Sequence, residues 1–423
     1  MLRTSPFWCA TAVITIASCS GGDSDRRDPL VSRDTVGDTI VVRTEVGSLW
    51  GAPRELVPTV SIGVLQGEDA YMFGSVRAIA VAPDERIFVL DTQVPAVRLF
   101  SADGVHIRDV GRVGEGPGEF QEPDGGLAYM PDGRVIVRDP GTGKMVVFDG
   151  DGEPVDDWRL PYGGGFNTTR GFHWDSAGHL LTFTITNMGA PVTEWERGFI
   201  RFHPTGTVRD TIIPPDWDFE EWVVSAQREN SSSTSRVPYG PESVVFYSPL
   251  GYWVGGVNTD YRIEQFRPDG TILRIERAWE PVGVNREEAS LLRRRLEENF
   301  RRNFPGWSWN GPDIPPTKPP YADLYVAEDG RIWVVVATES EEYLSPADVA
   351  EEERQTGSVI NRFRAPVAFD VFEPDGDYLG RATAPVGFSL SARPVFRGET
   401  VWATMRDEFD VQRVVRFELA PND

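Results

Sequence analysis

Two short phrases alternate along this chain, six times each, and this repetition restricts the fold more than any other feature of the sequence. The first phrase is a tight turn followed by a β-rich run, and the second is a strand that ends in Phe. The first phrase occupies residues 83–91, 131–139, 176–183, 249–254, 328–334 and 396–402. The second occupies residues 97–104, 146–152, 200–206, 263–270, 369–376 and 414–417. Self-similarity of this kind indicates a repeat architecture.

Each repeat supplies four antiparallel strands, which is the content of one propeller blade. A single four-stranded sheet cannot bury both of its faces, so six such sheets must stack around an axis. The sequence therefore predicts an all-β, six-bladed β-propeller domain over residues 37–423, with four antiparallel strands per blade. The blades are expected at residues 74–111, 118–161, 166–215, 239–283, 321–385 and 386–421.

The last repeat has no obvious fourth strand at the C-terminus. Residues 57–63, just before the first blade, resemble the outer strands of other repeats, such as residues 107–111. We predict that this segment completes blade six and closes the ring.

The run GRVGEGPGEFQEP at residues 111–123 adds a resemblance to a known family. Together with the repeats it resembles the NHL-type six-bladed β-propellers, in particular an exported group from bacteria. The resemblance covers about residues 57–421 and implies the fold. It implies no activity, because propellers serve as scaffolds, receptors, lyases and lactonases alike.

The N-terminus has the pattern of an export signal. Arg3 gives it a positive start, residues 7–17 are mainly apolar, and Ser18 precedes Cys19. The sequence IASC resembles the lipobox of bacterial lipoproteins, which implies that Cys19 becomes the acylated first residue. We expect a signal peptide at residues 1–18 and a flexible tether at 19–36, with the protein anchored by lipid in the bacterial cell envelope and facing the periplasm or the exterior. The alternative is an ordinary secretory signal cut elsewhere.

Charge and cysteine content restrict the partners and the chemistry. The chain has 65 acidic and 42 basic residues, a net charge of −23, which disfavours binding to nucleic acid. Its membrane contact is expected through the lipid anchor only, and a monomer is expected. The other cysteine, Cys9, is removed with the signal, so the mature chain has neither a disulfide nor a thiol nucleophile.

Successive antiparallel strands place their connections alternately on the two faces of the propeller. Four long insertions lie either between second and third strands or between consecutive blades, so they should all rise from the same face. They span residues 187–197, 216–239, 285–320 and 339–361. Binding residues concentrate on such loops. In the third insertion the sequence predicts a helix, because Asn285 can act as its N-cap and Glu288 follows three residues later, as in a capping box. Its apolar stripe is expected to pack onto the propeller, and the alternative is a partner-binding helix. The stripe consists of Ala289, Leu292, Leu296 and Phe300.

Tryptophans in the insertions are the first candidate ligand-binding residues. They are Trp195, Trp217, Trp222, Trp307 and Trp309. They would line a cleft that stacks against a sugar or a peptide, or else form a local apolar core beneath the loops.

Four other candidates lie near the expected pore. Asp91, Arg138 and Asp139 end second strands and point toward the elaborated face, where they would hold a cation or a polar ligand. The alternative is that the carboxylates accept hydrogen bonds from loop amides. His173, on an innermost strand, is the one plausible general base, and its alternative role is structural. His179 and His203 are expected to face solvent.

Catalytic chemistry finds little support in the sequence. The four histidines lack the spacing of a zinc site, and no residues are assigned to catalysis or to a metal. The sequence favours a binding or scaffolding module for a protein, peptide or glycan, without a cofactor. The alternative is a calcium-dependent propeller hydrolase or lyase with the ion in the pore. A chelator that shifts the melting temperature would favour the second class.

Overall fold

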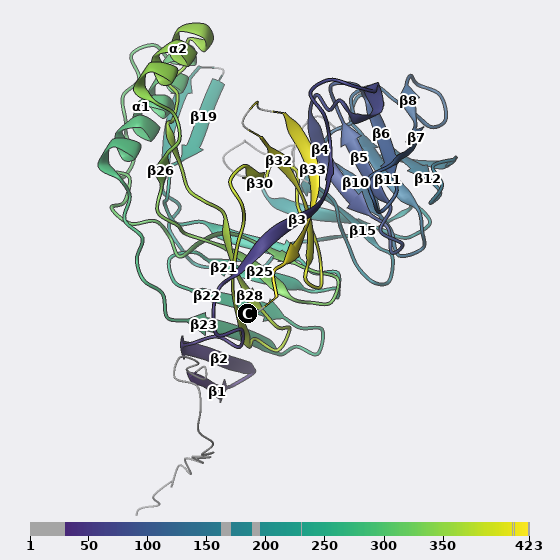
Figure 1. Ribbon diagram of the computed structural model, residues 1–423. Helices are drawn as coiled ribbons and strands as arrows, with labels where there is room; N and C mark the ends of the chain where they lie inside the picture. The colour runs from purple at the N-terminus through teal and green to yellow at the C-terminus, as the bar shows by residue number, and fades with distance from the viewer. Residues whose placement is uncertain are drawn as a thin grey trace, which may run out of the picture.

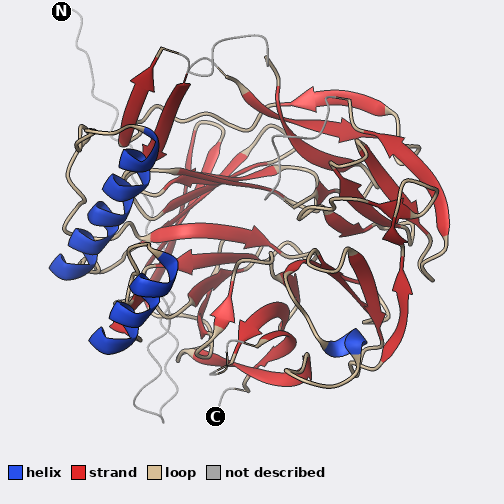
Figure 2. Cartoon of the chain, turned by 90° about the horizontal axis from the view of Figure 1, so that it is seen from above, coloured by secondary structure: helices blue, strands red, loops and turns tan. Residues whose placement is uncertain are grey.

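Six antiparallel sheets surround a common axis as the blades of a β-propeller (Figures 1 and 2). The structure, a computed structural model, describes residues 30–161, 171–187, 195–229, 231–407, 409 and 411–421. Blade one consists of β4 (Val76–Val81), β5 (Ile87–Asp91), β6 (Ala96–Phe100) and β7 (His106–Val110). Blade two consists of β10 (Leu127–Tyr129), β11 (Val135–Asp139), β12 (Lys144–Phe148) and β13 (Pro154–Arg159). Blade three consists of β14 (His173–Trp174), β15 (Leu180–Ile185), β16 (Arg197–Phe202) and β17 (Val208–Ile212).

The other three blades follow along the chain, and blade six also includes a strand from the N-terminal part of the sequence. Blade four consists of β20 (Ser243–Tyr247), β21 (Trp253–Val257), β22 (Arg262–Phe266) and β23 (Ile272–Arg277). Blade five consists of β24 (Tyr321–Val326), β25 (Ile332–Val336), β28 (Ala368–Phe372) and β29 (Tyr378–Thr383). Blade six consists of β30 (Phe388–Ser389), β31 (Val395–Arg397), β32 (Thr400–Arg406), β33 (Gln412–Leu419) and β3 (Arg54–Ile62).

The remaining elements decorate this ring. Two α-helices, α1 (Arg286–Asn303) and α2 (Pro346–Thr356), lie in the described insertions, and a 3-10 helix, η1 (Asp69–Tyr71), precedes blade one. The short sheets are β8 (Arg112–Val113) with β9 (Glu119–Phe120), β18 (Val223–Arg228) with β19 (Ser231–Arg236), and β26 (Glu341–Glu342) with β27 (Phe363–Arg364).

Apolar side chains fill the space between neighbouring blades. Successive side chains of a strand point to opposite faces of its sheet, so every blade contacts both neighbours. In β5, Phe88 and Leu90 pack toward blade two, whereas Ile87 and Val89 pack toward blade six. Among the described residues this alternation gives one apolar cluster at each of the six blade interfaces. The blades therefore stabilise one another.

The turns between third and fourth strands set the spacing of the blades. Gly152 and Gly206 have φ angles of +86° and +80°, a region that favours glycine. A Cβ atom on Gly152 would lie 2.4 Å from Val110 Cγ2, and one on Gly206 would lie 2.3 Å from Trp158 Cδ1. In blades two and three the glycine turn thus allows the blade to approach the outer strand of the preceding blade.

Strand β3 closes the ring. It pairs antiparallel with β33, its residues 56–62 lying opposite residues 414–419, and so forms the outer strand of blade six. This confirms the closure predicted for residues 57–63, although the strand begins earlier, at Arg54. The Arg54 guanidinium donates from Nε to the carbonyl oxygen of Ala420 at 2.6 Å and from Nη1 to Glu399 Oε1 at 2.7 Å. Blade six is therefore assembled from both ends of the chain.

The N-terminal hairpin extends blade four. β1 (Leu30–Val36) pairs with β2 (Thr39–Val46), and β2 pairs in parallel with β23. The prediction of a flexible tether up to residue 36 is therefore wrong for residues 30–36. β1 is almost entirely exposed and is held by backbone hydrogen bonds, so its sequence lacks the alternation that identifies a strand. Residues 1–29, which include the predicted signal and Cys19, lie outside the described residues.

Three insertions pack together at one end of the propeller, which we call the elaborated end (Figures 1 and 2). They are the β18–β19 hairpin, α1 and α2. The predicted helix is α1, with Asn285 as its N-cap, but its Phe300 packs against Val224 and Ala226 of the hairpin. The expectation that the stripe packs onto the propeller is thus wrong for Phe300. The remaining insertion, at residues 187–197, has its residues 188–194 outside the described residues.

Closure of the ring predicts unequal effects of two substitutions on β3. Leu56 is 2% exposed and packs between blades five and six, so Leu56→Ala should lower the free energy of unfolding by about 3 kcal/mol. Val57, the next residue, is 42% exposed, and Val57→Ala should change the free energy of unfolding by less than about 0.5 kcal/mol. Urea unfolding followed by circular dichroism measures both, and equal effects would contradict the role of β3 in closure.

Candidate functional site

The innermost strands of the six blades line an axial channel of about 300 Å³. This volume is at the lower end of the range of small-molecule sites. Charged and titratable side chains in its wall include Arg77, His173, Asp323 and Arg393, which lie at or just before the starts of inner strands. Because the inner strands all begin at the elaborated end, these groups gather in that half of the channel.

Arg393 is held in the channel wall by blade three. Its Nη1 donates to the carbonyl oxygen of Phe172 at 2.8 Å, and its Nη2 lies 3.3 Å from His173 Nε2. Its guanidinium carbon lies 5.2 Å from the centre of the Phe246 ring. In the part of the chain that the structure describes, no carboxylate is within ion-pair distance of Arg393. Burial lowers the pKa of Arg393, although Asp323 acts in the opposite direction.

His173, the predicted general base, orients Arg393. Its Nδ1 lies 3.2 Å from the carbonyl oxygen of Tyr247, an acceptor, so Nδ1 carries the proton. Because a guanidinium only donates, Nε2 accepts from Arg393 and the imidazole is neutral. The ring is also enclosed by Phe199 and Phe246. This arrangement supports the structural role, since the basic nitrogen is already engaged.

Asp323 faces the same channel from β24. Its Oδ1 accepts from the Leu324 amide at 2.8 Å, and its Oδ2 accepts from the Tyr325 hydroxyl at 3.0 Å. Burial raises the pKa of Asp323, whereas these two hydrogen bonds and the nearby Arg393 lower it. The carboxylate therefore lies in the field of Arg393 without an ion pair to it.

Asp323 and Arg393 were missed by the sequence analysis. They are 70 positions apart, and neither belongs to a recognisable motif. Their position in the repeats could have identified them. The repeats locate the starts of the innermost strands, and a charged residue at such a start must line the channel.

The predicted candidates Asp91 and Asp139 hold loops. Asp91 accepts from the amides of residues 74 and 75, and Asp139 from those of residues 121 and 122, at 2.8–2.9 Å. Asn258 occupies the same place in blade four and accepts from the amide of Glu242 at 2.8 Å. These contacts support the loop-holding alternative for both carboxylates.

Arg138 joins blades two and three. Its Nε donates to both oxygens of Asp124 at 2.9 Å, and its Nη1 donates to Thr182 Oγ1 at 2.7 Å. Its guanidinium carbon lies 5.2 Å from the centre of the Phe172 ring. Burial raises the pKa of Asp124, whereas Arg138 acts to lower it. The buried charge of Arg138 is thus compensated within the protein.

The five candidate tryptophans lie in different places. Trp222, Trp307 and Trp309 surround the cluster of α1 and the β18–β19 hairpin. Trp217 packs on Phe266 and donates to Glu264 Oε2 at 3.0 Å, and Trp195 packs at the interface of blades three and four. The structure therefore favours local apolar cores over a shared stacking cleft.

A groove of about 880 Å³ runs between α1 and α2 and the segments that flank them. Its apolar residues are Leu292, Leu296, Val359, Ile360 and Phe363, and its charged residues are Arg236, Arg295, Arg302, Arg364, Glu298 and Glu352. Arg236 pairs with glutamates, whereas Arg295, Arg302 and Arg364 form no ion pair with any described residue. The groove thus combines an apolar floor with an excess of cations.

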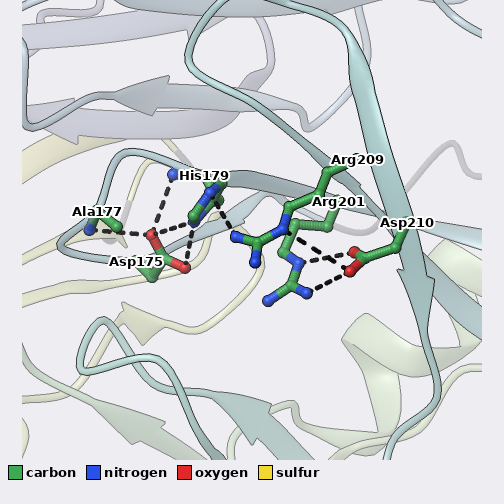
Figure 3. A network of polar contacts seen from close by, with 6 residues as sticks. All are labelled: Asp175, Ala177, His179, Arg201, Arg209 and Asp210. Atoms are coloured by element: carbon green, nitrogen blue, oxygen red, sulfur yellow. Dashed lines mark hydrogen bonds and ion pairs between the residues drawn. The ribbon is translucent and has the colours of Figure 1, made fainter.

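A polar network at the opposite end fixes His179, contrary to the expectation that it faces solvent (Figure 3). Its Nδ1 lies 3.0 Å from Asp175 Oδ2, and its Nε2 accepts from Arg209 at 2.7 Å. Arg201 donates to Asp210 at 2.8 Å and lowers the pKa of that carboxyl. The network ties a turn of blade three to its outer strands.

Comparison with known proteins identifies the fold. The family model DUF5128, described as a 6-bladed beta-propeller, matches residues 59–166. The fold is a six-bladed β-propeller. No protein of curated function matches the sequence.

Solved propeller structures are similar over most of the chain. A member of the duf4221 family from Bacteroides vulgatus has 11% identity and a TM-score of 0.50, covering 87% of this chain and 98% of its own. A protein from Bacteroides fragilis has 12% identity and a TM-score of 0.48, covering 90% and 100%. A gluconolactonase from Xanthomonas campestris has 12% identity and a TM-score of 0.40, covering 87% and 100%. At 11% identity the similarity to the duf4221 protein bears on the fold alone, and nothing is concluded from the two structures with lower TM-scores.

No group of three or more His, Cys, Asp or Glu among the described residues is arranged to hold a metal ion. No described helix is long and apolar enough to cross a membrane.

The role of Asp139 as a loop holder predicts a loss of stability on its removal. Asp139→Ala should lower the free energy of unfolding by about 3 kcal/mol, because two loop amides and the Thr142 hydroxyl lose a charged acceptor. The control is Asp151→Ala, whose side chain is 83% exposed and whose loss should cost less than about 0.5 kcal/mol. Urea unfolding distinguishes the two, and a stable Asp139→Ala variant would return this carboxylate to the list of candidate ligands.

Proposed function

We propose that this propeller is an exported, lipid-anchored binding or scaffolding module of the NHL type, and that its partner is a protein or peptide segment that lies in the groove between α1 and α2. The observation that carries the proposal is the excess of guanidinium groups over this apolar groove. The whole chain has a net charge of −23, so a locally positive surface is unusual on this protein. Such a surface would attract an acidic partner.

The groove supports a segment with apolar and acidic residues. Leu292 and Leu296 are only partly buried on α1, so an apolar side chain placed against them would lose contact with water. Arg295 and Arg364 would donate to carboxylates at the rim of the groove. A helix or an extended peptide can present both kinds of group at the required spacing.

A glycan is less well supported as the partner. Sugars bind on exposed aromatic faces, yet three of the candidate tryptophans pack around the cluster of α1 and the hairpin. Tyr343 in the groove is 48% exposed, but its ring also contacts the Arg364 guanidinium, whose carbon lies 5.0 Å from the centre of the ring.

A calcium-dependent hydrolase or lyase is also less well supported. Such a site needs carboxylates that are free to bind the ion. Asp91 and Asp139, the carboxylates nearest to this role in the sequence, accept hydrogen bonds from loop amides instead.

Crosslinking tests the groove directly. A photo-crosslinking amino acid at Leu296 should give a discrete adduct in the native host, because this position would contact the partner. The same amino acid at Val208, an exposed position on the outer strand of blade three, should give none. Charge reversal by Arg295→Glu and Arg364→Glu together should reduce the Leu296 adduct at least tenfold, as expected for the loss of two charge-assisted contacts.

Two outcomes would contradict the groove as the binding site. One is an equal yield of adducts from Leu296 and Val208. The other is an adduct at Leu296 that persists after charge reversal in a variant whose melting temperature equals that of the wild type.

Substitution of Cys19 tests the anchor. The wild-type protein should sediment with membranes and incorporate labelled palmitate, whereas Cys19→Ala should remove the acylation site, abolish labelling and leave the protein unanchored. Fractionation and labelling of the two proteins at matched expression measure this. A wild-type protein that is neither labelled nor sedimented with membranes would favour the ordinary secretory signal, and a Cys19→Ala protein that stays labelled would contradict Cys19 as the acylated residue.

A further inference from the structure

The axial channel contains two opposite charges that are not paired with each other. Arg393 and Asp323 both line it, and within the described part of the chain neither forms an ion pair with any residue. The Arg393 guanidinium packs on the Phe246 ring, and the centre of that ring lies 6.1 Å from the centre of the Tyr325 ring. The Tyr325 hydroxyl donates to Asp323, so the two charged groups lie near the same part of the wall. Since both line the channel without forming an ion pair with each other, a ligand in the channel can contact both.

Burial is unfavourable for both charges. It lowers the pKa of Arg393 and raises that of Asp323, and in each case it is the largest influence. Removing a charge from water costs free energy unless an opposite charge or strong hydrogen bonds replace the water. A ligand that carries both a negative and a positive group would satisfy both residues at once.

The surroundings hold the two residues in place. Arg393 is fixed by the Phe172 carbonyl, His173 and the Phe246 ring. These contacts use two of the five guanidinium N–H groups and leave the others available to a ligand. Asp323 is fixed by the hydroxyl of Tyr325 and a backbone amide.

Aromatic residues form part of the wall near these charges. Phe246 lies 6.1 Å from Tyr325 and Tyr325 lies 5.2 Å from Phe396, measured between ring centres, and all three line the channel. Such a wall suits an apolar or aromatic body on the ligand.

From these observations we propose that the channel binds a free amino acid with an apolar or aromatic side chain, whose carboxylate is held by Arg393 and whose ammonium is held by Asp323. This site is separate from the groove between α1 and α2. Its ligand is a small zwitterion, whereas the groove is complementary to an acidic peptide segment.

Three related probes separate the two charge contacts. L-Phenylalanine carries both charges, 3-phenylpropanoate lacks the ammonium, and 2-phenylethylamine lacks the carboxylate. Isothermal titration of the wild-type protein should give saturable binding of L-phenylalanine and at least tenfold weaker binding of the other two, because a charge-assisted hydrogen bond contributes about 1.5–3 kcal/mol.

Three variants assign the contacts. Asp323→Asn should weaken L-phenylalanine about tenfold and leave 3-phenylpropanoate unchanged, and Arg393→Gln should weaken both carboxylates and leave 2-phenylethylamine unchanged. The control is Glu328→Gln, which changes a carboxylate at the other end of the channel and should leave all three affinities unchanged. Retained binding of the unaffected probe shows in each case that the channel is folded.

The proposal would be overturned by the absence of saturable L-phenylalanine binding to the wild type. It would equally be overturned if 3-phenylpropanoate bound as tightly as L-phenylalanine, or if Glu328→Gln weakened L-phenylalanine as much as Asp323→Asn does.

Discussion

The backbone pairing of β3 with β33 is the interaction on which the rest of this structure depends. Each blade is a small sheet with two apolar faces, and a ring of such sheets leaves none of those faces uncovered. Without β3, blade six would expose the apolar surface that Leu56 and Ile62 cover. The ring is therefore stabilised by contacts between residues that are far apart in the sequence, and its cooperativity follows from closure.

Closure also places the functional surfaces. Once the blades surround one axis, every inner strand begins at the same end, so residues such as His173, Asp323 and Arg393 converge although they belong to three different blades. The connections between second and third strands and between consecutive blades lie at that end too, which brings α1, α2 and the β18–β19 hairpin together. The candidate groove and the charged half of the channel thus share one end of the molecule.

Local sequence signals explain which predictions succeeded. The glycine turns, the Phe-ended strands and the cap at Asn285 are short patterns with a direct physical cause, so the blades, the closing strand and α1 could be predicted. The site was predicted less well. Asp91 and Asp139 were visible as strand ends, but whether a carboxylate binds a ligand or a loop amide depends on the loop that folds over it. β1 was missed because its exposed strand lacks an apolar pattern.

The sequence by itself determined the number of blades, their strands and the side on which the insertions rise, because these follow from repeat spacing and strand parity. Only the tertiary structure decided which side chains meet. Arg393 contacts His173 from a position 220 residues away, and Phe300 of α1 meets a hairpin rather than a blade. Such contacts arise from packing between segments whose separation in the sequence carries no local signal.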